Sequence, residues 1–207
     1  TTMPIRDLAV AATGRVTAVL ADTDVAWINT YDSDGKLRYK GQASMNNSGY
    51  PTAISLSPNG DLLAVAYMYL DAGVLKTNVA FYNFGEVGQN YISNLVGQVQ
   101  YTKCMVPRIE FWDNDTVLVM GENVMELFSM EERPSSVYKK ELSAEVQSIA
   151  FGEYFCTVTK NAEGQTVLEA YNKSGEVCMK KIVTLPYVGL HTAGDEVVLY
   201  SYSGCEV

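Results

Sequence analysis

Few side chains in this sequence could carry out chemistry. His191 is the only histidine, so any Ser-His-Asp or Cys-His arrangement for nucleophilic catalysis has to include it. It lies in residues 188–192, which are expected to form a strand, and a structural or channel-lining role competes there with a catalytic one. The patterns G-x-x-x-x-G-K-[ST], G-x-S-x-G and G-x-G-x-x-G do not occur, so phosphate-cradle, hydrolase and dinucleotide sites have no support. We expect no catalytic residue.

Metal ligands are equally scarce. The sequence contains no H-E-x-x-H and no C-x-x-C pattern, which are the common signatures of zinc and redox sites. The run Asp32-Ser33-Asp34-Gly35 opens like a calcium-binding loop, but it lacks the third ligand and the downstream Glu. A hairpin turn explains this run better. No metal and no cofactor are predicted.

The four cysteines are spaced too widely for a metal motif, at Cys104, Cys156, Cys178 and Cys205. Free, buried thiols are the favoured interpretation, and disulfides in an oxidising compartment are the alternative. Cys156 and Cys178 are predicted to lie on the second and fourth strands of one repeat. A third strand then separates them, and at about 4.8 Å per strand their Cα atoms lie beyond the roughly 7 Å limit of a disulfide.

Aromatic residues and charge bear on the partners. The chain has 14 Tyr, 6 Phe and 2 Trp; Tyr67, Tyr69, Tyr91 and Tyr101 could form a platform for a glycan or a peptide. Packing between repeats is the other interpretation of these tyrosines. The net charge of −9 opposes binding to a phosphate backbone or to an anionic membrane surface. Nucleic acid is therefore not an expected partner.

The elements that would position these residues form a repeat. A polar turn recurs before an apolar strand of β-forming residues, and Asn59-Gly60 is its clearest instance. The turns lie at Gly14, Gly60, Asn114, Gly152 and Gly194, in steps of 46, 54, 38 and 42 residues. The strands that follow are expected at 16–20, 62–67, 116–120, 155–159 and 197–200.

A second marker keeps the same phase. A third strand ends in an aromatic residue before a polar turn, at 27–31, 79–82, 124–128 and 168–171, and a fourth strand follows at 36–43, 90–96, 136–142 and 176–185. Four antiparallel strands per repeat indicate an all-β chain and a β-propeller of four-stranded blades. One domain is expected over residues 1–207, with repeats at 5–46, 50–97, 104–143 and 146–186 and a partial fifth at 187–207. A β-sandwich is the alternative.

The turn between the first two strands carries a resemblance. Ser57-Pro58-Asn59-Gly60-Asp61-Leu62-Leu63-Ala64-Val65 is similar to the S-P-D-G-x-x-L-A-V element of WD40-type and TolB-type propellers. The wider pattern, with Tyr31-Asp32 and Tyr171-Asn172 opening x-x-Gly turns, resembles the DUF5711 family of Firmicutes. The Gly-His and Trp-Asp signatures of WD40 repeats are missing, since the only Trp-Asp, Trp112-Asp113, lies elsewhere.

The resemblance implies a bacterial propeller held outside the cell by an N-terminal membrane helix. It favours a non-catalytic extracellular binding or scaffold module that presents its loops to a protein or a cell-surface carbohydrate. The alternative is a carbohydrate-active lyase or hydrolase with acidic residues or His191 at the central channel.

The fifth repeat stops within its third strand, at Cys205 to Val207. Because an open sheet edge leaves unpaired backbone groups and invites association, this pattern predicts a segment of a larger propeller. Contact with a membrane would then depend on an anchor outside this chain, and a homodimer through the open edges is expected.

Overall fold

The computed structural model describes residues 4–22, 26–43, 49–142, 144 and 146–207. The regular structure of these residues consists of antiparallel sheets and two short 3-10 helices, η1 (Val87–Asn90) and η2 (Ile92–Asn94). The chain is divided into two compact units, unit 1 with residues 1–136 and unit 2 with residues 137–207. No helix in the described residues is long and apolar enough to cross a membrane.

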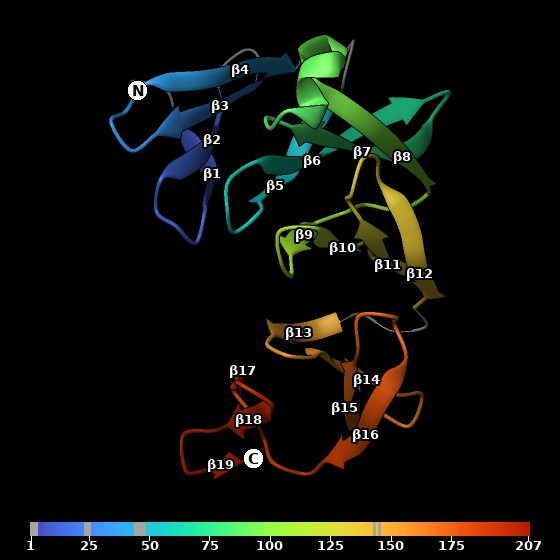
Figure 1. Ribbon diagram of the computed structural model, residues 1–207. Coiled ribbons are helices and arrows are strands. Elements are labelled where there is room, and N and C mark those ends of the chain that lie inside the picture. Colours follow the sequence, from blue (N-terminus) through green and yellow to red (C-terminus); the bar gives the residue numbers. More distant parts are fainter. Residues whose placement is uncertain (1–3, 23–25, 44–48, 143, 145) are drawn as a thin grey trace. The chain divides into compact units, whose positions relative to one another are not determined.

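Each sheet is built from consecutive strands (Figure 1). The first sheet consists of β1 (Ile5–Val10), β2 (Val16–Asp22), β3 (Ala26–Asp32) and β4 (Leu37–Ala43), and the second of β5 (Tyr50–Leu56), β6 (Leu62–Asp71), β7 (Val74–Asn83) and β8 (Leu95–Thr102). The third consists of β9 (Arg108–Phe111), β10 (Thr116–Met120), β11 (Val124–Ser129) and β12 (Ser135–Glu141), and the boundary between the units falls within β12.

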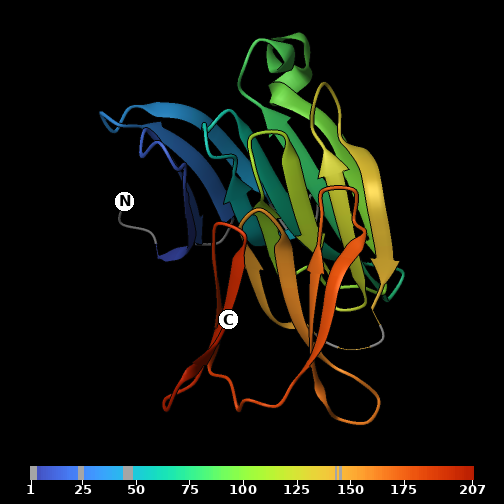
Figure 2. The same ribbon diagram turned by 60° about the horizontal axis from the view of Figure 1, so that its bottom comes forward.

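Unit 2 continues the pattern. The fourth sheet consists of β13 (Val146–Phe151), β14 (Phe155–Lys160), β15 (Thr166–Tyr171) and β16 (Val177–Val183), and the fifth of β17 (Gly189–Ala193), β18 (Glu196–Tyr200) and β19 (Cys205–Glu206). Figure 2 shows the twist of the strands within each sheet. Four sheets of four strands and one of three, each in sequence order, confirm the predicted all-β blades.

One strand was placed wrongly by the sequence. The fourth strand of the second repeat was predicted at 90–96, whereas β8 begins at Leu95. The residues before it form η1 and η2, in which Ser93 and Asn94 have positive φ angles of 56° and 60°. Left-handed backbone at two consecutive residues interrupts the extended chain, so the strand starts later.

The recurring first turns join neighbouring sheets. In unit 1 the Thr13 N–H donates to the carbonyl oxygen of Pro58 (3.3 Å), and the Asn59 N–H donates to Asn114 Oδ1 (2.9 Å). In unit 2 the Glu153 N–H donates to the Gly194 carbonyl oxygen (3.3 Å). The marker that defines the repeat is thus also a contact between successive repeats.

Another kind of hairpin turn occurs three times in the described residues with the same geometry. Its first side chain, from Asp32, Asn161 or Asn172, accepts hydrogen bonds from the backbone N–H groups two and four residues later, at 2.8–3.1 Å. This is an Asx turn, in which a short polar side chain takes the place of a backbone acceptor. The run at Asp32 is therefore a hairpin turn, as expected.

Two of these turns provide a matched pair of substitutions. Gly164 and Gly175 both have φ of +78°, but a Cβ atom would meet nothing within 4 Å at Gly164 and would lie 2.0 Å from Tyr138 Cγ at Gly175. We expect Gly164→Ala to lower the free energy of unfolding by about 1 kcal/mol, because the left-handed conformation disfavours a Cβ. Gly175→Ala should lower it by about 2 kcal/mol, because the Tyr138 ring must also move.

Thermal unfolding of both variants, followed by circular dichroism, gives the comparison. Equal destabilisation by the two substitutions would contradict the predicted contribution of Tyr138.

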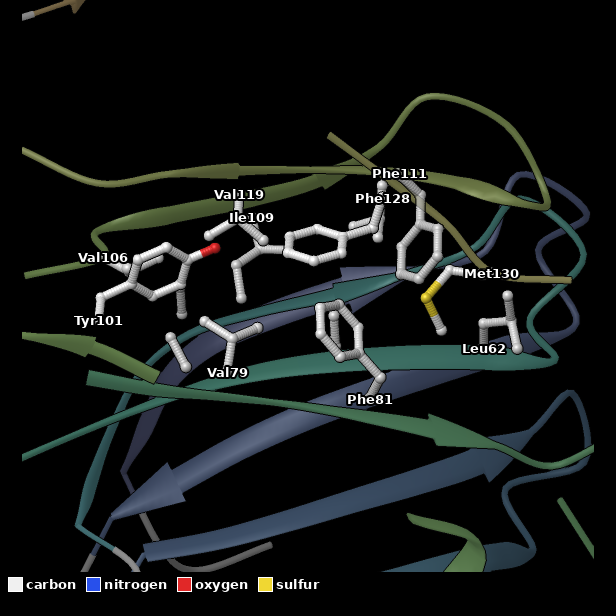
Figure 3. Close-up of a cluster of buried hydrophobic side chains, with 14 of the residues drawn as sticks. Leu62, Val79, Phe81, Tyr101, Val106, Ile109, Phe111, Val119, Phe128 and Met130 are labelled. Carbon is white, nitrogen blue, oxygen red and sulfur yellow. The ribbon is translucent and has the colours of Figure 1, made fainter. Parts of the chain in front are cut away.

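The main core of unit 1 lies between the second and third sheets. Phe81 on β7 and Phe128 on β11 point toward one another, with ring centroids 5.3 Å apart (Figure 3). The hydroxyl oxygen of Tyr101 also points into this cluster (Figure 3). A second cluster joins the first and second sheets, and unit 2 has its own between the fourth and fifth.

Candidate functional site

The first strands of the three sheets of unit 1 lie next to one another. β1 contacts β5, and β5 contacts β9. The Ile54 N–H donates to Asp7 Oδ2 (3.4 Å), and the Phe111 N–H donates to Ser55 Oγ (3.3 Å). Each of these strands is the edge strand of its sheet, so its outer backbone groups are not paired within the sheet.

A groove with a volume of about 360 Å³ runs along these edge strands. Its walls include Ala12 and Pro58 from the first turns, Ser55 from β5 and Glu110 from β9. The Glu110 carboxylate is held by Arg108, whose guanidinium nitrogens lie 2.8 Å from Oε2. The groove therefore combines backbone edges and short side chains with one ion pair.

A second recurring feature is a position on the third strand of each sheet, which we call the acceptor position. Cross-strand pairing aligns it with an apolar residue of the first strand. The rows are Leu8–Val19–Asn29, Ile54–Val65–Ala80, Ile109–Val119–Glu126, Ile149–Thr157–Glu169 and Leu190–Leu199–Glu206. Since residues in one row share a face of the sheet, the five acceptor positions all lie on equivalent faces.

In the third sheet the acceptor is Glu126, which is buried. It accepts hydrogen bonds from the Tyr101 hydroxyl (2.8 Å) and from Ser136 Oγ (2.7 Å). Tyr101 comes from β8, the fourth strand of the preceding sheet. Burial, together with the charge of Glu126 and the hydrogen bond to it, raises the pKa of Tyr101, so this hydroxyl keeps its proton.

In the fourth sheet the acceptor is Glu169. Its Oε2 lies 3.0 Å from Lys140 Nζ and 2.5 Å from the Tyr171 hydroxyl, and its Oε1 lies 3.0 Å from Lys180 Nζ. Burial raises the pKa of Glu169, but the hydrogen bonds from Tyr171, Lys180 and Lys140 outweigh it and lower the pKa to about 2. This carboxylate is ionised at neutral pH, and both of its oxygens are engaged.

The same contact recurs at two other places. Lys181 on β16 pairs with Glu206 on β19 at 2.6 Å. In the second sheet the acceptor position holds Ala80, which cannot accept a side-chain hydrogen bond. Tyr82, two residues later on β7, makes the contact with the preceding sheet instead, with its ring 5.6 Å from that of Tyr39 on β4. The fourth strand of one sheet thus repeatedly reaches the third strand of the next through a polar side chain.

The residues considered for catalysis have the following surroundings. His191 lies on β17 in unit 2 with an exposed side chain. The acidic residues beside the groove belong to unit 1, where backbone N–H groups of Leu8 and Ile54 hold Asp7 and Arg108 holds Glu110. The described residues contain no group of three or more His, Cys, Asp or Glu that could hold a metal ion.

The four tyrosines do not form one platform. Tyr67 is buried in the cluster of the first and second sheets, with its hydroxyl 3.1 Å from that of Tyr82, and Tyr101 is buried in the cluster of the second and third. Tyr69 accepts a hydrogen bond from Gln100, and Tyr91 accepts one from Arg133. Packing between repeats accounts for the two buried rings.

The cysteine prediction is half right. Cys104 and Cys156 are free and buried, and burial raises the pKa of the Cys156 thiol to about 11. Cys178 and Cys205 are free but exposed, so the prediction of burial was wrong for them. The reason is their position, since most of β16 is exposed and Cys205 pairs with the exposed Tyr200. β15 does separate Cys156 from Cys178.

The sheets and their linked first turns are those of β-propeller blades, and solved structures agree. The WD40 domain of SCAP from fission yeast matches with a TM-score of 0.64 and 14% identity over 99% of this chain and 49% of that chain. The acylaminoacyl peptidase of Pyrococcus horikoshii matches with a TM-score of 0.60 and 11% identity over 94% of this chain and 35% of that chain. The chain thus spans about half and about a third of their lengths.

The chain belongs to DUF5711, a family of unknown function, whose family model matches residues 1–207. The comparison with curated proteins finds no match. At these identities the likeness to the solved structures shows the fold alone.

Sequence reasoning missed the groove and the acceptor position. The groove depends on edge strands that are far apart in the chain, and no local pattern reports it. The acceptor position could have been recognised in the sequence, because it precedes by two residues the aromatic residue that marks the end of the third strand. This spacing holds for Asn29, Glu126 and Glu169.

Proposed function

We propose that this protein is a non-catalytic binding module outside the cell and that the groove of unit 1 holds an extended segment of a protein ligand. The observation that carries the proposal is the groove beside the edge strands β1, β5 and β9. An extended peptide can bind along an edge strand while its alternate side chains enter pockets. The first strands of propeller blades surround the central channel, which is where a ligand segment would enter.

The charge of the protein favours a neutral or basic segment. The net charge is −9, and a field of this sign attracts cationic partners and repels acidic ones. Within the groove Glu110 is the charged residue of the wall, and it is partly offset by Arg108.

Two features support a non-catalytic role. Glu126 and Glu169 are engaged by hydroxyl and ammonium donors, and Asp7 is held by backbone N–H groups. A general acid needs a pKa near the working pH, whereas the pKa of Glu169 is about 2. The Tyr31-Asp32 and Tyr171-Asn172 turns resemble those of the DUF5711 family, and this resemblance supports a location outside the cell. Labelling of the native protein on the surface of intact cells tests this location.

The binding proposal is tested with a random peptide library displayed on phage and panned against the protein. We expect enrichment of extended, neutral or basic sequences. Ala12→Trp should weaken the binding of the selected peptides at least about tenfold, since a hot-spot contact is worth more than 1 kcal/mol. Ala12 is exposed and lines the groove, so the indole would fill the groove without disturbing the core.

Ala162→Trp is the matched control, because Ala162 is an exposed alanine in the Asx turn of unit 2. Its affinity should equal that of the unsubstituted protein. Equal binding by the Ala12→Trp variant would exclude the groove as the site, and a library that yields no specific peptide would contradict a protein ligand.

A further inference from the structure

A polar pocket lies between the fourth and fifth sheets. Its volume is about 430 Å³, and its wall combines residues of β13, β14 and β15 with the segment that connects β16 to β17. Val158 and Leu168 share a core cluster with Leu199 of the fifth sheet. Ser148 lies in one row with Val158 and Leu168, so its side chain is also on the face toward the fifth sheet. All wall residues that the structure describes belong to unit 2.

The second sheet shows the same place of the repeat in a closed form. There Thr77 Oγ1 donates to the Cys104 carbonyl oxygen (2.7 Å), and Thr52 Oγ1 donates to the Val106 carbonyl oxygen (3.0 Å). These bonds hold the segment between β8 and β9 against β5 and β7. Thr77 and Val106 have no exposed surface, and Cys104 is 2% exposed. In unit 1 the chain itself therefore fills this place.

Cross-strand pairing identifies the residues of unit 2 that correspond to this closed place. The strands are aligned by the rows that contain the acceptor position, and the connecting segments by counting back from Ile109 and Leu190. The corresponding pairs, with the residue of unit 1 first, are Thr52 and Gln147, Ala53 and Ser148, Met68 and Lys160, Thr77 and Thr166, and Val106 and Tyr187.

Three apolar residues of the closed place are thus polar in unit 2. Ser148, Lys160 and Tyr187 replace an alanine, a methionine and a valine, and all three line the pocket. Thr166 keeps the hydroxyl group of its counterpart, but its side chain is partly exposed. The repeat therefore departs from its apolar pattern at one place, and the departing residues face one cavity.

The fold leaves these polar groups available to a ligand. The Tyr187 hydroxyl lies 3.4 Å from Ser148 Oγ and 3.5 Å from Gln147 Oε1, which is long for a hydrogen bond between such groups. Lys160 is exposed and forms no ion pair within the described residues. Among the described wall residues it is the only charged one. The pocket thus offers hydroxyl and amide groups that donate and accept, together with one ammonium group that only donates.

We propose that this pocket binds a uronic-acid unit of a carbohydrate. The ring hydroxyls of a sugar donate and accept hydrogen bonds, as the hydroxyl groups of the wall and the Gln147 amide do. The Lys160 ammonium matches the carboxylate of the sugar in charge and in donor character. The Tyr187 ring offers an apolar surface to the C–H groups of the sugar ring.

The net charge of −9 acts differently from Lys160. Exposed charges more than about 8 Å apart are largely screened at physiological ionic strength, whereas a carboxylate in the pocket contacts the Lys160 ammonium directly. The local charge therefore decides the preference of this site. The pocket is built from other residues than the groove of unit 1, so this proposal does not rest on peptide binding there.

An array of oligosaccharides that contains uronic acids and their neutral counterparts tests the proposal on the whole chain, followed by isothermal titration calorimetry. We expect a glucuronic or galacturonic acid to bind more tightly than the matching glucose or galactose. Lys160→Met should weaken the binding of the acid at least about tenfold, because a charge-assisted hydrogen bond is lost. It should weaken the neutral sugar less. Methionine stands at the corresponding place of the second sheet, so the fold should tolerate the change.

Lys173→Met is the matched control, because it makes the same chemical change at an exposed residue of unit 2. Lys173 lies in the turn between β15 and β16, whereas the pocket adjoins the turn between β14 and β15 at the opposite end of β15. The affinity of this variant should equal that of the unsubstituted protein.

Three results would each overturn the proposal. They are an array on which no uronic acid is bound, equal affinity for the acid and its neutral counterpart, and equal weakening by Lys160→Met and Lys173→Met.

Discussion

Replacing Phe81 by alanine is expected to lower the free energy of unfolding of unit 1 by about 4 kcal/mol, since removal of a buried phenylalanine side chain typically costs about 3–5 kcal/mol. Phe81 has no exposed surface, and its ring packs against that of Phe128 at 5.3 Å between centroids. The substitution removes a contact that joins the second sheet to the third. We therefore expect it to weaken the attachment of one blade to the next as well as the blade itself.

Tryptophan fluorescence in a urea titration measures this effect selectively. Trp27 and Trp112 are the only tryptophans, and both lie in unit 1. Leu70→Ala is the control, and it should change the stability by less than about 0.5 kcal/mol because Leu70 is exposed. A decrease in the free energy of unfolding as small as that of the control would mean that the stability of the second and third sheets does not depend on the contact between Phe81 and Phe128.

The second large effect is expected in unit 2. Glu169→Gln removes the charge that Lys140 and Lys180 share, and it leaves the half-buried Lys140 ammonium without a counter-ion. Removing one partner of a buried ion pair typically costs about 3–5 kcal/mol. Because Lys180 is largely exposed and can turn to water, we expect about 3 kcal/mol.

The pH dependence of this substitution follows from the pKa of Glu169. This pKa is about 2 in the folded protein, against an ordinary value of 4.5 for a glutamate, so the carboxylate stabilises the folded state above pH 4.5. That contribution is lost as the pH falls through about 2. The difference in stability between the unsubstituted protein and the Glu169→Gln variant should therefore be full at neutral pH and shrink on acidification.

Urea unfolding followed by far-UV circular dichroism at several pH values gives this difference. Glu163→Gln is the control, because Glu163 lies in an exposed turn. A difference that stays constant between neutral pH and about pH 2 would rule out the ionised carboxylate as the source of the stabilisation.

The sequence predicted the blades well because their signals are local. The turn at Asn59-Gly60 and the aromatic residue Tyr171 before Asn172 each mark a strand end within a few residues. The start of β8 was not predicted because Ser93 and Asn94 adopt positive φ angles although neither is a glycine, the residue that usually marks this conformation in a sequence. The exposed Cys178 was missed because burial depends on which sheet covers a strand, and not on the residue type.

The candidate site was harder to predict for a related reason. The groove is built from β1, β5 and β9, whose side chains are short or apolar and carry no motif. Only the acceptor position could have been found by aligning the third strands, since Asn29, Glu126 and Glu169 share their distance to the next aromatic residue. Its partners, such as Lys140, come from another repeat, so that part of the site requires coordinates.

The linked first turns indicate where this fold can be lengthened during evolution or by protein engineering. A Cβ atom at Gly60 would lie 2.6 Å from Val16 Cγ2, and the Asn59 N–H is bonded to Asn114, so an insertion there would separate three blades at once. The hairpin at Ala72-Gly73 has the opposite character, because a Cβ atom at Gly73 would meet nothing within 4 Å. New loops, fluorescent labels or whole inserted domains should therefore be tolerated at the Ala72-Gly73 hairpin and excluded from the turn at Asn59-Gly60.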